Sequence, residues 1–138
     1  MPQKEVIAQI EGREAFLNVL QNNPGLLIVK FGATWCRPCK TIEPLVHGFF
    51  TTSPAHVACA DLDVDMEGNI DVYGYLRSKK MVTGIPVLLC YKKKNLAKEQ
   101  ITFIPDDSVT GASAADLDAF FKRCGKHLED VRINVGLN

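Results

Sequence analysis

Two cysteines, two residues apart, are the side chains of this sequence best suited to chemistry. Cys36 and Cys39 lie in the run Trp35-Cys36-Arg37-Pro38-Cys39, where an apolar segment passes into a helical pattern. A thiolate is the attacking species in thiol–disulfide exchange, and the unpaired N–H groups at the start of a helix favour it. We therefore expect Cys36 to attack a disulfide and Cys39, one turn further on, to displace the mixed disulfide.

A single C-x-x-C pattern also fits half of a zinc site or a pair of structural cysteines. Cys59, Cys90 and Cys124 form no second C-x-x-C pair, so the sequence disfavours a metal site. Cys124 falls on an apolar helical stripe, and the other two lie inside predicted strands. We interpret all three as core residues, and the three histidines as surface or helix-packing residues.

Length and composition indicate one domain with a substantial core, since 46% of the 138 residues are hydrophobic. We assign this domain to residues 1–128 and treat 129–138, where the apolar pattern fades, as a C-terminal tail. Lysine plus arginine and aspartate plus glutamate both number 16, so no net charge draws in nucleic acid or an anionic membrane.

The expected setting is reducing and aqueous. No stretch approaches the roughly 20 apolar residues of a membrane span, and the N-terminus shows no export pattern. The chain has 5 cysteines, and an odd number fits a reducing compartment with one working pair. We expect a cytoplasmic monomer with neither membrane nor nucleic-acid partners.

Strands alternate with helices along the chain. The apolar run at 26–31 is typical of a central strand covered on both faces and paired in parallel. Near the end, a basic turn at 92–98 predicts an antiparallel hairpin. The order is βαβαβαββα, with strands predicted over 6–10, 26–31, 57–64, 87–91 and 100–104 and helices over 13–21, 36–50, 67–80 and 114–128.

The sequence resembles the thioredoxin family in the stretch from Val29 to Lys40, in Gly84-Ile85-Pro86 and in Gly111-Ala112. The resemblance spans about residues 5–128. It implies an α/β thioredoxin-like fold, a five-stranded mixed sheet flanked by four helices, with the active site at the head of the second helix. It also implies a dithiol–disulfide oxidoreductase without a bound cofactor, with disulfide-containing protein substrates and electrons from a separate thioredoxin-reductase-type donor.

The resemblance assigns a role to Pro86. In the family, this proline follows a cis peptide bond beside the cysteine pair, and the backbone of the preceding residue pairs with an extended substrate. The substrate-binding rim implied for this chain comprises Trp35, Arg37, Pro38, Gly84, Ile85, Pro86 and Gly111.

Two positions depart from the family pattern. Arg37 replaces the usual glycine, and its charge should favour the Cys36 thiolate and make the disulfide more oxidising; the alternative is a solvated arginine. Lys30 replaces a buried aspartate, and Asp61 stands where the family has a lysine on the neighbouring strand. We expect a swapped pair that supports catalysis beneath Cys39, the alternative being two unrelated side chains.

These features favour a protein disulfide reductase that uses the Cys36–Cys39 pair. A disulfide oxidase or isomerase is the enzymatic alternative, favoured by Arg37. A non-catalytic binding module is the other alternative, because apparent insertions at 65–84 and 105–109, together with the tail, are suited to partner recognition.

Overall fold

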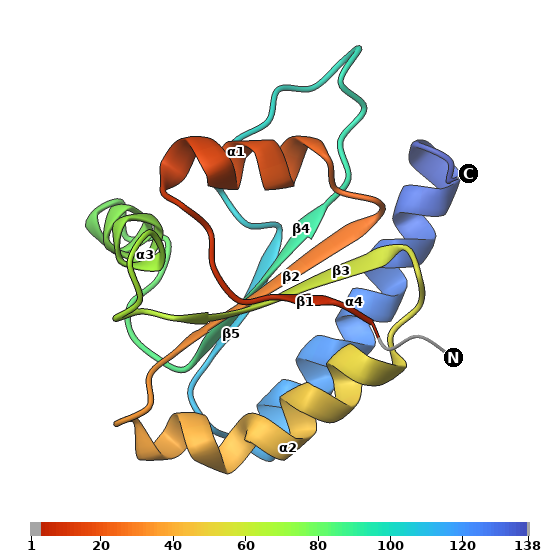
Figure 1. Ribbon diagram of the computed structural model, residues 1–138. Coiled ribbons are helices and arrows are strands. Elements are labelled where there is room, and N and C mark those ends of the chain that lie inside the picture. The colour runs from red at the N-terminus through yellow and green to blue at the C-terminus, as the bar shows by residue number, and fades with distance from the viewer. Residues whose placement is uncertain (1–3, 138) are drawn as a thin grey trace.

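The computed structural model describes residues 4–137 as a five-stranded sheet between two pairs of helices (Figure 1). The strand order is β1-β3-β2-β4-β5, with β1, β3 and β2 parallel and β4 antiparallel to its neighbours β2 and β5. The predicted order βαβαβαββα is confirmed. The elements are β1 Val6–Ile7, α1 Arg13–Gln21, β2 Leu26–Gly32, α2 Arg37–Thr52, β3 Val57–Asp63, α3 Asn69–Ser78, β4 Val87–Lys92, β5 Asp107–Thr110 and α4 Ala114–Asn134.

The central strand β2 separates two apolar cores, because successive side chains of a strand point to opposite faces. Leu27 and Val29 belong to the core that contains residues of α1 and α3, and Ile28 belongs to the core beneath α2 and α4. Every residue of β2 is buried. The prediction of a strand covered on both faces is therefore confirmed.

The last helix, α4, begins as predicted and ends later. The Ser113 hydroxyl accepts a hydrogen bond from the Asp116 amide at 3.2 Å, which caps the first turn. The helix continues past the predicted end at 128, because Val131 extends the buried stripe and is only 2% exposed. The residues around Val131 are mostly polar and exposed, so the apolar pattern of the sequence does not indicate that the helix continues. No helix within residues 4–137 is long and apolar enough to cross a membrane.

The strand predicted over 100–104 is wrong. The partner of β4 is β5, and residues 93–106 form a long loop that projects from the sheet (Figure 1). The Phe103 ring lies 5.7 Å from the Phe16 ring of α1 and 5.3 Å from the Tyr75 ring of α3. The apolar alternation around Phe103 thus serves packing against helices and not pairing in the sheet.

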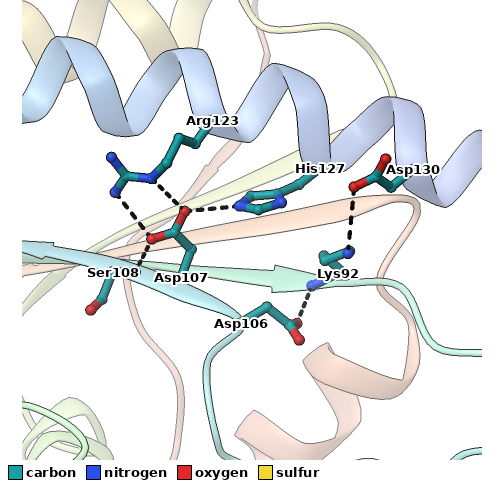
Figure 2. A network of polar contacts seen from close by, with 7 residues as sticks. All are labelled: Lys92, Asp106, Asp107, Ser108, Arg123, His127 and Asp130. Carbon is teal, nitrogen blue, oxygen red and sulfur yellow. Dashed lines mark hydrogen bonds and ion pairs between the residues drawn. The ribbon is translucent and has the colours of Figure 1, made fainter.

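A polar network joins the edge strand β5 to α4 (Figure 2). The Asp107 carboxylate accepts hydrogen bonds from Arg123 Nε at 2.8 Å and Nη2 at 3.1 Å, and its Oδ2 lies 2.8 Å from His127 Nε2. Bonding to Arg123, helped by His127 and the Ser108 amide, lowers the pKa of Asp107 to about 2. His127 therefore has the helix-packing role that was predicted, and its contact with Asp107 is a detail that the local sequence pattern does not indicate.

Candidate active site

Cys36 and Cys39 form a disulfide at the start of α2, with their Cα atoms 5.3 Å apart. The chain leaves β2 and turns sharply, since the Cys36 amide donates to the Ala33 carbonyl at 3.2 Å. Cys36 is the N-cap of α2, and its sulfur accepts a hydrogen bond from the Cys39 amide at 3.2 Å. A sulfur in this position is stabilised as a thiolate by the helix N-terminus once the disulfide is reduced.

Neither half of the disulfide is freely exposed, since Cys36 is 5% and Cys39 is 4% accessible. Trp35 beside them is 70% exposed, and its indole N–H donates to Asp65 Oδ2 at 2.7 Å. Asp65 follows β3, and no local pattern indicates this contact because the two residues lie 30 positions apart. The contact holds the indole against the loop after β3.

The Gly84–Pro86 segment and Gly111 lie at the same end of the sheet as this disulfide, because β4 begins and β5 ends next to the end of β2. The Ile85–Pro86 peptide bond is cis, and the Gly111 amide donates to the Pro86 carbonyl at 2.9 Å. Gly111 has φ +97°, a conformation that favours glycine. Half-buried Ile85 packs on the apolar core that includes both cysteines. The structure thus brings these residues together at one end of the sheet.

Arg37 and Pro38 complete the set of residues predicted for the rim. They form the exposed first turn of α2, directly between the two cysteines. An arginine at this place adds a positive charge to the helix end that holds the Cys36 sulfur.

Lys30 and Asp61 are direct neighbours in the register of β2 and β3. Lys30 Nζ lies 3.6 Å from Asp61 Oδ1, which confirms the predicted pairing. The two side chains are unequally buried, since that of Lys30 is 6% exposed and that of Asp61 is 44% exposed. Asp61 is the more accessible member because it faces a pocket that opens to solvent.

This pocket has a volume of about 400 Å³ and lies between β2, β3 and the first turns of α2. A Cβ placed on Gly32 would lie 3.4 Å from Cys39 Sγ and 3.5 Å from Lys30 Cε, so these atoms approach each other across the glycine. Sequence reasoning did not find the pocket. Its charged residues and cysteine are Lys30, Cys39, Lys40, Glu43, Asp61 and Asp63.

A disulfide that caps a helix, at the end of a mixed five-stranded sheet where a cis proline also lies, is the arrangement of a dithiol–disulfide oxidoreductase. Comparisons with known proteins agree. The thioredoxin family model matches residues 7–114. Horse thioredoxin is 32% identical over 119 residues, covering 85% of this chain and 97% of the relative. A solved structure of Trichomonas vaginalis thioredoxin is 29% identical with a TM-score of 0.63, covering 86% of this chain and 96% of that one.

This chain belongs to the thioredoxin family. The predicted fold class and the oxidoreductase assignment are therefore confirmed. Proteins of this family act on disulfide substrates, are reduced in turn by a reductase, and need no bound cofactor.

Proposed function

We propose that this chain reduces disulfides in protein substrates and is regenerated by a separate thioredoxin-reductase-type donor. The observation that carries the proposal is the position of the Cys36 sulfur at the N-cap of α2. There it accepts a hydrogen bond from the Cys39 amide at 3.2 Å. Such a sulfur is a good nucleophile at neutral pH and a good leaving group in the reverse step.

The reaction has two exchange steps. The Cys36 thiolate attacks one sulfur of the substrate disulfide, which forms a mixed disulfide and releases the first substrate thiolate. Cys39, as thiolate, then attacks the Cys36 sulfur, which closes the Cys36–Cys39 disulfide and releases the second substrate thiolate. The two electrons gained by the substrate come from the two cysteines, and the reductase restores them without a cofactor bound to this chain.

The second step needs a proton acceptor for the Cys39 thiol. Asp61 takes this role through the pocket, and Lys30 holds the carboxylate in place as a positioning residue. The support is the 3.6 Å ion pair and the opening of the same pocket onto Cys39. Asp61→Asn should therefore slow closure of the Cys36–Cys39 disulfide and leave the first attack by Cys36 nearly unchanged.

An extended substrate segment docks on the rim beside the disulfide. Its backbone pairs with Ile85, and its side chains contact exposed Trp35 and the first turn of α2 at Arg37 and Pro38. Gly84, Pro86 and Gly111 shape this surface. The proposal is supported by the hydrogen bond from the Gly111 amide to the Pro86 carbonyl. This bond holds Pro86 in place and leaves Ile85, the residue before it, at the edge of the site.

Turnover with a protein disulfide tests the reductase assignment. Wild-type protein with a thioredoxin-reductase-type enzyme should reduce the disulfide catalytically, and Cys36→Ser should abolish turnover. The matched control is Cys124→Ser, which changes a buried cysteine of the other core. A wild-type protein that oxidises dithiols efficiently but is not turned over by the reductase would instead favour an oxidase or isomerase.

That second function has an observation in its favour. Arg37 lies in the first turn of α2, directly after Cys36, and buried Lys30 faces the Cys39 pocket, so each cysteine of the pair has a cation in its surroundings. Positive charge stabilises thiolates, which makes a disulfide more oxidising. The reduction potential of the Cys36–Cys39 pair separates the two functions.

A further inference from the structure

The pocket beside Cys39 opens at a point of the fold where ligands commonly bind. β2 and β3 are parallel neighbours, but the connection after β2 leads to α2 on one face and the connection after β3 leads to α3 on the other (Figure 1). In open α/β sheets, such diverging connections leave a crevice at the carboxyl ends of the strands. Residues near those ends of β2 and β3 line this pocket.

The size and charge of the pocket define a class of ligand. Its volume of about 400 Å³ lies in the range of small-molecule sites. Lys40 and Glu43 of α2 and Asp63 of β3 bring charges of both signs to the opening. Lysine side chains of the lining can bind a ligand carboxylate, and its carboxylates can bind a ligand ammonium group. This lining therefore matches a zwitterionic ligand.

Lys30 supplies the amine at the buried side of the pocket. Its side chain is 6% exposed, and its nearest paired oxygen, Asp61 Oδ1, is 3.6 Å away. That separation exceeds a direct hydrogen bond, so the ammonium keeps donors for a ligand carboxylate. Cys39 forms another part of the lining, and a ligand in this space therefore meets the disulfide from the Cys39 side.

We propose that the pocket binds a small zwitterionic thiol of the amino-acid type, which exchanges with the disulfide at Cys39. The proposal rests on the redox function proposed above. The ligand thiolate attacks Cys39 Sγ, the Cys36–Cys39 bond breaks, and Cys36 leaves as a thiolate at the helix N-terminus. A second ligand thiolate then attacks the bound ligand sulfur and releases Cys39. Two ligand thiols become one disulfide, and their two electrons and two protons pass to the cysteine pair.

Reduction kinetics with three thiols test the proposal. The probes are L-cysteine, which carries both charges, cysteamine, which carries only the amine, and 3-mercaptopropionate, which carries only the carboxylate. Trp35 is the only tryptophan and is 70% exposed beside the disulfide, so its fluorescence reports the reaction. At equal thiolate concentrations, L-cysteine should react about tenfold faster with a rate that saturates, as expected for a binding step worth roughly 1.4 kcal/mol.

Variants of the pocket lining give the matched comparison. Lys30→Gln, which removes the ammonium that binds the ligand carboxylate, and Glu43→Gln should each reduce the L-cysteine rate to that of the singly charged thiols. Lys126→Gln and Glu129→Gln make the same changes on the exposed face of α4 and should leave it unchanged. The unreactive analogue S-methyl-L-cysteine should shift the amide NMR signals of the pocket residues in wild-type protein only.

Equal rates for the three thiols, or a preference that survives both pocket variants, would overturn the proposal. Turnover of a protein disulfide by the reductase is measured in parallel on every variant. Intact turnover without a preference for L-cysteine rejects the pocket ligand alone. A clear preference in a wild-type protein without turnover supports the pocket ligand and rejects the reductase function.

Discussion

Lys30 and Asp61 form an asymmetric pair, and this asymmetry decides what each substitution should do. Asp61→Asn leaves the buried Lys30 ammonium without a counter-ion, so it should lower the free energy of unfolding by about 1–3 kcal/mol. Lys30→Met should cost less, because water solvates the half-exposed Asp61 carboxylate and methionine fills the buried space. Urea denaturation measures both. Equal single losses that simply add in the double mutant would argue against direct pairing.

Arg37 tests how far one exposed charge tunes the disulfide. Arg37→Gln should move the reduction potential of the Cys36–Cys39 pair to more negative values, because the reduced form loses a cation near the Cys36 thiolate. Equilibration with glutathione buffers measures the potential, and the difference should shrink in high salt. Arg132→Gln in the last turn of α4 is the control. An unchanged potential in Arg37→Gln would mean that Arg37 is only solvated.

At the scale of elements, Asp107 of β5 connects this strand to α4 through hydrogen bonds with Arg123 and His127 (Figure 2). Asp107→Asn should lower the free energy of unfolding by about 1.5–3 kcal/mol near neutral pH, since it removes charge-assisted hydrogen bonds. The exposed Asp118, which pairs with Lys122 one turn away, is the control for an aspartate-to-asparagine change. In thermal and urea unfolding, the stability of Asp118→Asn should be close to that of wild type.

The same contact predicts a pH dependence. The pKa of Asp107 falls from 3.8 to about 2 on folding, so the unfolded chain takes up this proton at a higher pH than the folded protein. The Asp107 contribution is therefore complete above its unfolded pKa and is lost as the pH falls toward 2. The stability of wild type and Asp107→Asn should converge over that interval. A difference that stays constant down to pH 2 would contradict the assigned cause.

At the scale of the whole molecule, the 93–106 loop and the disulfide lie at opposite ends of the sheet. The loop follows Lys92, which pairs with Leu26 at the start of β2, whereas Cys36 follows the end of β2. Phe103→Ala should remove ring contacts with α1 and α3 and cost about 1–3 kcal/mol, less than a fully buried phenylalanine. Turnover per folded molecule should stay at the wild-type value. A loss of turnover with full stability would connect the loop to substrate binding.

Local patterns were sufficient for much of this architecture and failed where distant residues decide the structure. The unbroken apolar run of β2 and the cap at Ser113 carry their own signals, and both predictions are confirmed. The swapped pair was predicted from the resemblance to the thioredoxin family, which implied that Asp61 is the neighbour of Lys30, and the strand register agrees. The Trp35–Asp65 and Asp107–His127 contacts join residues 30 and 20 positions apart, and the Cys39 pocket depends on three elements. Spacing alone cannot find such features.

Covalent trapping tests the central claim, that Cys36 attacks and Cys39 resolves, most directly. Reduced Cys39→Ser protein is mixed with a disulfide-containing protein substrate and examined by mass spectrometry under non-reducing conditions. We predict a mixed disulfide between Cys36 and the substrate that persists, because the resolving Cys39 thiol is absent and the other cysteines are buried, and no mixed disulfide with Cys36→Ser. Trapping by Cys36→Ser through Cys39 with equal yield, or no trapping by either variant, would contradict the account.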